Sequence, residues 1–149
     1  MTERILVPED QAADLAAAVT ALLRRFKLEP GLLAGSAYTD LHVNDVGLLS
    51  ALSQTGEWTV RRLAQTLAAP DSTVSSALDR LEGRSLVARS RSKSDRRVVR
   101  LELTSEGRAL SDRLRAAQIE NSREMLTQLL PQDRSELVRL ITTVAQRRP

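Results

Sequence analysis

The sequence contains no cysteine and only one histidine. Without cysteine, the chain has no disulfide framework, no thiol-based redox sensor and no thiolate metal site, and it suits a reducing compartment. A zinc site is not expected either, because zinc in proteins is held mainly by cysteine and histidine. We therefore expect neither a metal nor another cofactor.

Aromatic residues make up only 2% of the chain, although hydrophobic residues account for 42%. A core of leucine, valine and alanine follows, which favours helix packing over an all-β fold. No apolar run approaches the roughly 18 residues of a membrane span. The first residues, MTERILVPEDQ, lack the basic and apolar regions of a signal peptide. These absences predict a cytoplasmic chain without membrane association.

Catalytic signatures are also missing from the sequence. It shows no nucleophile–base pair, no glycine-rich phosphate loop and no cluster of metal ligands. An enzyme with an unrecognised site is therefore the least favoured class. RNA binding is not indicated, because nothing resembles an aromatic platform on which bases could stack.

The positive charge of the chain is concentrated in one segment. Six basic residues and one acidic residue give residues 85–100 a charge of +5, so the rest of the chain carries −2 of the total of +3. A local excess of this kind is what a DNA groove-binding element requires.

Apolar residues recur at helical spacing before this basic segment. The pattern predicts a first helix from Glu9 to Leu28 and a loop over Gly31–His42. A second helix is expected with Asn44 as its N-cap, a third with Thr59 as its N-cap, and a fourth directly after Pro70. The third and fourth helices flank a tight turn, which predicts a helix-turn-helix.

After the fourth helix, the spacing of apolar residues changes from the helical period to every second residue. Val99, Leu101 and Leu103 alternate with polar or outward positions, and Val87–Arg91 is the candidate partner strand. Lys93–Arg97 would form the hairpin loop. A basic hairpin directly after a helix-turn-helix is a wing.

Two amphipathic helices complete the chain. Thr104 is expected to cap a long helix reaching about Leu130, and Pro131 to open the last helix. The first and last helices each carry an apolar stripe, which a second copy of the chain could bury. We therefore predict a mainly α fold with a small β-hairpin wing. Residues 44–104 form a winged helix-turn-helix lobe, called the reading lobe below, and residues 9–30 and 105–148 form a helical dimerisation lobe.

The run from Thr59 to Gly107 resembles the MarR family of regulators, named after multiple antibiotic resistance. TVRRLAQTLAAPDSTVSSALDRLEGRSLV is similar to the third and fourth helices of the family, SDRR to its wing tip, and VRLELTSEG to its return strand and following turn. The resemblance extends over nearly the whole chain, so that residues 1–149 form a single MarR-type unit. It implies a homodimer on a two-fold symmetric site in double-stranded DNA, with the fourth helix in the major groove and the wing in the minor groove. Three residues depart from the family: Ala68 and Ser85 stand where glycine is frequent, and Ser76 where arginine is common.

Ten residues of the fourth helix and the wing are candidates for DNA contact. Short hydroxyl side chains let a helix approach bases and phosphates closely, and arginine suits the negative potential of the minor groove. We expect Arg97 to enter the minor groove, oriented by Asp95 as in the Asp-x-Arg pair of the family, and Arg96 to contact phosphate. An ordinary solvated helix face and turn are the alternatives. The candidates are Ser72, Thr73, Ser75, Ser76, Arg80, Arg91, Lys93, Asp95, Arg96 and Arg97.

Tyr38, His42 and Trp58 are candidates for an effector site. The resemblance implies a cleft between the lobes that takes small aromatic or phenolic compounds, with Arg24 or Arg25 as a possible carboxylate partner. In the alternative these residues are structural, and Trp58 packs at the base of the wing. The favoured function is a DNA-binding repressor released by a small aromatic ligand. A winged-helix module for protein contacts is the main alternative, although its wing would be expected to be neutral or acidic.

Overall fold

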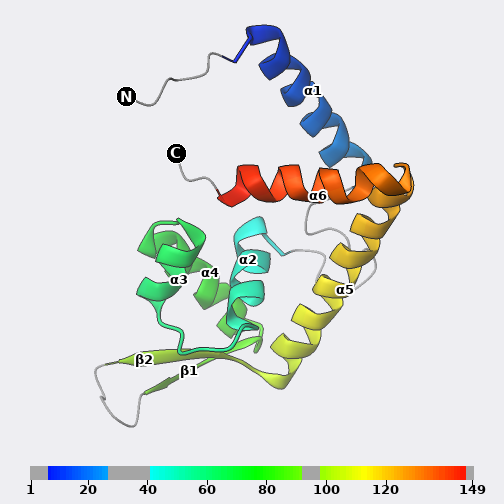
Figure 1. The fold of residues 1–149 in the computed structure, drawn as a ribbon. Coiled ribbons are helices and arrows are strands. Elements are labelled where there is room, and N and C mark those ends of the chain that lie inside the picture. The colour runs from blue at the N-terminus through cyan, green and yellow to red at the C-terminus, as the bar shows by residue number, and fades with distance from the viewer. Residues whose placement is uncertain (1–6, 27–40, 92–97, 147–149) are drawn as a thin grey trace.

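The computed structural model describes residues 7–26, 41–91 and 98–146 (Figure 1). In chain order the elements are α1 (Glu9–Phe26), α2 (Val43–Leu52), α3 (Val60–Leu67), α4 (Asp71–Gly83), β1 (Val87–Arg91), β2 (Val99–Leu103), α5 (Ser105–Thr127) and α6 (Pro131–Gln146). A mainly helical fold with one antiparallel hairpin is therefore confirmed. None of the helices in these ranges is long and apolar enough to cross a membrane.

Hydroxyl side chains begin two of the helices as predicted. Thr59 Oγ1 accepts the N–H of Arg62 at 3.2 Å, and Thr104 Oγ1 accepts the N–H of Gly107 at 3.0 Å. The prediction for α2 was wrong by two residues, because its N-cap is His42 rather than Asn44. The Asp45 carboxylate accepts the His42 N–H at 3.1 Å, and this bond starts the helix earlier.

Two non-glycine residues in the described ranges have left-handed backbone conformations. Ala68 ends α3 with φ 49° and ψ 41°, and Ser85 follows α4 with φ 58°. These are two of the three positions at which the sequence departs from the MarR pattern. The backbone keeps the glycine-type turn at both positions, so the departure costs conformational energy rather than changing the turn.

A leucine-rich core lies between α2, α3, α4, the hairpin and the first turns of α5. Its largest fully buried side chains include Leu48, Leu49, Leu63, Leu78, Leu81, Leu86, Leu101 and Leu110. Ser111 on α5 is also buried, and its hydroxyl donates to the Leu49 carbonyl oxygen of α2 at 3.3 Å. The start of α5 is thereby fixed to the reading lobe.

The hairpin pairs in one register, from Val87 opposite Leu103 to Arg91 opposite Val99. Its base meets the first turn of α5 at Gly107, where a Cβ atom would lie 1.9 Å from the Leu86 carbonyl oxygen. Only glycine allows α5 to approach Leu86, the residue before β1, this closely.

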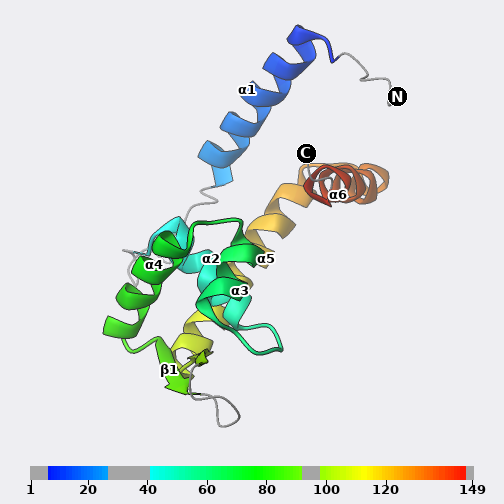
Figure 2. The same cartoon turned by 90° about the vertical axis from the view of Figure 1, so that its left-hand side faces the viewer.

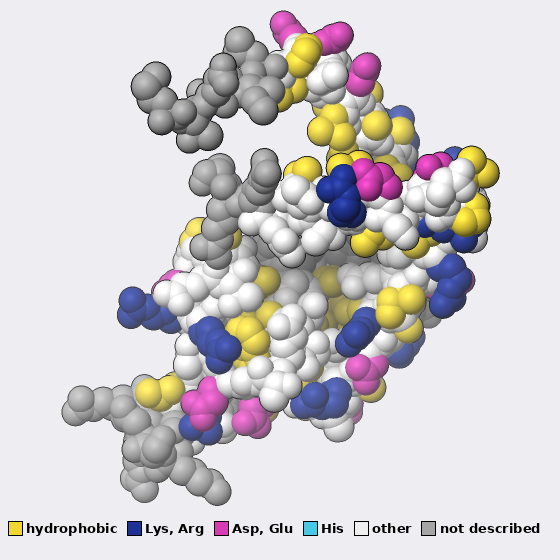
Figure 3. All heavy atoms as spheres, in the orientation of Figure 1, with side chains coloured by type: hydrophobic (Ala, Val, Ile, Leu, Met, Phe, Trp, Pro, Cys, Tyr) yellow, Lys and Arg dark blue, Asp and Glu magenta, His cyan; other side chains and the backbone are white. Residues whose placement is uncertain are grey.

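The terminal helices extend away from the core. Figure 2 shows α1 standing apart from the reading lobe, and α6 crossing the far end of α5. Exposed large apolar side chains occur on all three of these helices: Leu15, Val19 and Leu23 on α1, Ile119 on α5, and Val138, Leu140, Ile141 and Val144 on α6. Yellow spheres mark much of this surface in Figure 3.

Candidate nucleic-acid interface

The fourth helix of the fold, α4, separates an apolar inner face from a polar outer face. Val74, Ala77, Leu78 and Leu81 are buried, whereas Ser72 and Ser76 are exposed and Thr73 and Ser75 are half-buried. The Ser76 hydroxyl donates to the Ser72 carbonyl oxygen at 3.0 Å, so its oxygen remains available as an acceptor. Of the four predicted hydroxyl residues, Ser72 and Ser76 are the most accessible to a ligand.

Arg80 connects α4 with α2. Its Nη2 atom lies 2.7 Å from Asp45 Oδ1, and the Asp45 side chain is only 2% exposed. The other oxygen of this carboxylate accepts the backbone N–H of His42. Arg80 therefore helps to hold α4 in place, although 41% of its side chain is still exposed. This role is not visible in the sequence, because the two partners are 35 residues apart.

Two arginines of the basic segment are paired with acidic residues of the reading lobe. Arg89 on β1 contacts Asp79 and Glu82 of α4 at 2.5 and 3.1 Å, and Arg100 on β2 contacts Glu57 at 2.6 Å. The net charge of residues 85–100 thus overstates the positive charge that the wing can offer to a polyanion.

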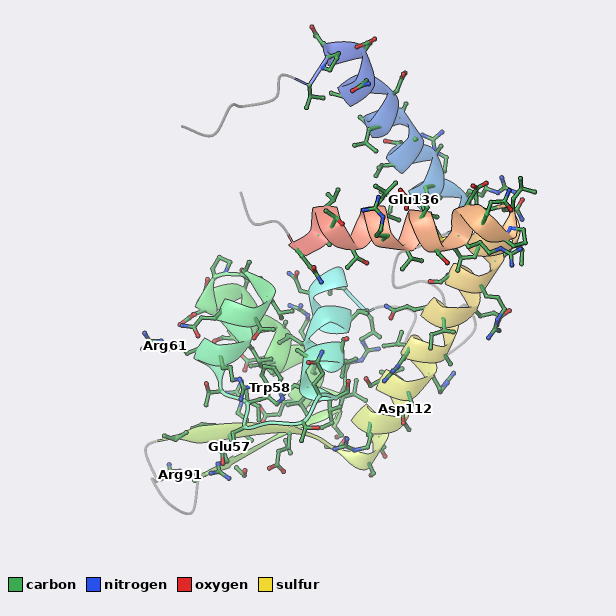
Figure 4. All side chains as sticks on the ribbon, in the orientation of Figure 1. Glu57, Trp58, Arg61, Arg91, Asp112 and Glu136 are labelled. Carbon is green, nitrogen blue, oxygen red and sulfur yellow. The ribbon has the colours of Figure 1, made fainter. Side chains whose placement is uncertain are left out.

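Arg91 differs from these two residues. It is exposed at the end of β1 and forms no ion pair within the described residues. Figure 4 shows Arg91 on the wing and Arg61 on α3 along the same edge of the molecule. Arg61 was not among the predicted contacts, although its position in the first turn of α3, off the apolar face, could have indicated it. The predicted wing-tip residues Lys93, Asp95, Arg96 and Arg97 lie outside the described residues.

Trp58 packs at the base of the wing. Its side chain is buried, its Nε1 atom donates to the Gln54 carbonyl oxygen at 3.1 Å, and the Arg62 guanidinium lies 4.5 Å from the ring centroid. The Leu101 N–H of β2 donates to the Trp58 carbonyl oxygen at 3.0 Å. These contacts match the structural alternative for this residue.

The predicted effector residues are not gathered in one place. His42 precedes α2 and Trp58 lies beyond its other end, with a ten-residue helix of about 15 Å between them. Tyr38 lies outside the described residues. A hollow of about 310 Å³ instead lies between α2 and α5, lined by hydroxyl, amide and apolar groups and by Arg115. The described ranges contain no group of three side chains able to hold a metal ion.

A helix-turn-helix followed by a hairpin, flanked by helices from both ends of the chain, defines a winged helix-turn-helix protein. Residues 41–99 match the model of the MarR family, so this part of the chain is similar to that family. The transcriptional repressor MdtR of Bacillus subtilis is 30% identical over 95 residues, which are 64% of this chain and 60% of MdtR. The chain thus spans about three fifths of this curated relative.

Solved structures share the fold over most of the chain. FabT of Streptococcus pneumoniae, in complex with DNA, has a TM-score of 0.79 at 20% identity, with coverage of 91% of this chain and 95% of FabT. BpsR of Bordetella bronchiseptica, whose DNA binding is regulated by 6-hydroxynicotinic acid, has a TM-score of 0.69 at 23% identity, with coverage of 89% and 94%.

Proposed function

We propose that this chain is a sequence-specific double-stranded DNA-binding regulator that acts as a homodimer and represses transcription. The observation that carries the proposal is the outer face of α4, with Ser72 and Ser76, next to a hairpin whose Arg91 is exposed and without an ion pair in the described part. MdtR, a repressor by name, and the DNA complex of FabT support it.

In this proposal α4 enters the major groove, where the hydroxyl groups of Ser72 and Ser76 approach base edges and phosphates. Arg61 and Arg91 contact phosphates on either side of α4. At the wing tip, Arg97 enters the minor groove and Arg96 contacts phosphate, as the sequence predicts. Specific recognition requires both contacts that position the protein and contacts to bases. Here α4 and the wing tip would contact the bases, and Arg61 and Arg91 would position the protein.

The wing tip tests the proposal. Arg97→Ala should weaken binding to a specific site by about 1–3 kcal/mol, the value of a good groove contact. Arg96→Ala should weaken specific and random DNA alike and reduce the slope of log affinity against log salt by about one. Equal and salt-independent affinities of the two variants and the wild type would contradict the assignment, and would favour the protein-interaction module.

We further propose that a small aromatic anion releases the protein from DNA. BpsR, whose DNA binding responds to a pyridine carboxylic acid, supports this class of effector. The hollow lies between α2 of the reading lobe and α5, the helix that precedes α6. Arg115 lines the hollow and supplies a cation for the carboxylate of an effector. The two reading helices of a dimer must lie about 34–36 Å apart to enter successive major grooves, so a ligand that favours another spacing opposes DNA binding.

Titration of a protein–DNA complex with salicylate tests this part of the proposal. Arg115→Ala should reduce the response to salicylate, because Arg115 lines the hollow. Arg113→Ala, on the same helix but outside the hollow, is the control and should respond like the wild type. If salicylate and related compounds leave the DNA affinity unchanged at millimolar concentration, the effector proposal fails. The proposal that the chain binds DNA does not depend on this result.

A further inference from the structure

Arg89 and Arg91 lie two residues apart on β1, so their side chains leave the same face of the strand. Arg89 is opposite the buried Leu101 in the hairpin, and Arg91 is opposite the exposed Val99, nearer the tip. The two arginines thus share one strand and one face, but they have different surroundings.

The Arg89 guanidinium is held by two carboxylates of α4. Its Nη2 atom contacts Asp79 Oδ1 at 2.5 Å, and its Nε atom contacts Glu82 Oε2 at 3.1 Å. Arginine that neutralises a DNA phosphate must offer its charge and its N–H groups to that phosphate. At Arg89 the charge and two of the three guanidinium nitrogens already face carboxylates of the reading lobe.

We propose that Asp79 and Glu82 determine specificity by holding Arg89 against α4. The two contacts fix the direction of the wing relative to the reading helix, and they keep one cation of the basic segment away from DNA phosphate. Non-specific binding depends almost entirely on phosphate neutralisation, so the cluster lowers the affinity for random DNA more than that for a specific site. This inference rests on the proposed DNA-binding function.

The cluster can be altered without unfolding the protein. The side chains of Arg89, Asp79 and Glu82 are 36%, 67% and 44% exposed. Ion pairs at such a surface contribute little to the free energy of unfolding. Circular dichroism during thermal unfolding should therefore show folded variants with melting temperatures close to that of the wild type.

The first experiment compares Arg89→Ala with Arg91→Ala, its matched control on the same strand face. DNA affinity is measured by fluorescence anisotropy over a series of salt concentrations, with a duplex selected by the wild-type protein and with a random duplex. Arg91→Ala should reduce the salt slope for both duplexes by about one, because one phosphate contact is lost. Arg89→Ala should leave the slope for random DNA unchanged and weaken binding to the selected duplex by about threefold to tenfold. An equal loss of slope in both variants would overturn the inference.

The second experiment releases Arg89 with the double substitution Asp79→Asn and Glu82→Gln. The affinity for random DNA should rise several-fold, and its salt slope should become steeper by about one. Because removing two negative charges can itself favour DNA, Arg89→Ala is added to this variant. The proposal requires the triple variant to return to the wild-type slope. A steeper slope that persists in the triple variant, or an unchanged slope in the double variant, contradicts it. Failure of the wild type to bind any duplex would instead overturn the proposed function.

Discussion

Among the described residues, the non-glycine positions Ala68 and Ser85 have left-handed, and therefore strained, backbone conformations. Ala68 has φ 49°, a conformation that costs an L-residue about 1–2 kcal/mol. A glycine at this position would remove that cost, but it would also lose more conformational entropy on folding, which offsets a part of the gain. We expect Ala68→Gly to stabilise the protein by about 0.5–1 kcal/mol, measured by urea unfolding as a higher midpoint at an unchanged m-value. The neighbouring Ala69→Gly is the control and should destabilise. Equal destabilisation by the two substitutions would argue against a strained turn.

Gly107 carries the opposite constraint. A Cβ atom there would meet the Leu86 carbonyl oxygen at 1.9 Å, whereas at Gly83 it would meet no atom within 4 Å. Gly107→Ala should therefore cost about 1–3 kcal/mol, as overpacking does, by forcing α5 away from β1. Gly83→Ala is the matched control, and its unfolding midpoint should be unchanged or higher. A neutral effect of Gly107→Ala would contradict the close approach.

At the scale of elements, Arg80 and Asp45 fix α4 against α2. Asp45→Ala removes a buried carboxylate with two partners, and it should cost about 2 kcal/mol after allowance for the exposed part of Arg80. Because the reading helix is then less well positioned, affinity for a selected duplex should fall relative to affinity for random DNA, whose salt slope should not become shallower. Urea unfolding and salt-dependent anisotropy measure the two effects. Equal affinity of the variant and the wild type for the selected duplex would contradict the positioning role of the pair.

The elements were largely predictable from the sequence, but their side-chain partners were not. Period-two apolar residues located both strands, and Thr59 and Thr104 located two helix starts, because these signals are local in the chain. The pairing of Arg80 with Asp45, and of Arg89 with Asp79, depends on how distant elements pack. The charge counted along the sequence therefore included Arg89 in the positive charge available to DNA, although Arg89 forms ion pairs within the reading lobe. The same limit applies to Trp58, whose packing against β2 only the tertiary structure shows.

In the whole molecule, the exposed apolar faces of α1 and α6 are expected to be buried against a second copy of the chain. Leu15 on α1 and Ile141 on α6 are 65% and 53% exposed. A groove of about 450 Å³ along α5, with Ile119 and Leu126 of α5 and Arg134 of α6 in its lining, adds to this surface. We expect a homodimer in analytical ultracentrifugation, and monomers or aggregates when residues from Pro131 onward are removed. An intact chain that stays a folded, soluble monomer at micromolar concentration would contradict the dimer.

Selection of DNA from a random pool tests most directly whether the chain recognises a two-fold symmetric site as a dimer. Purified protein is used to select duplexes from a random pool, and the retained fragments are sequenced. The retained fragments should share an inverted repeat whose half-sites are centred about one helical turn, roughly 10–10.5 base pairs, apart. Retained fragments without a common sequence, or no retained DNA at all, would contradict recognition of such a site by a dimer.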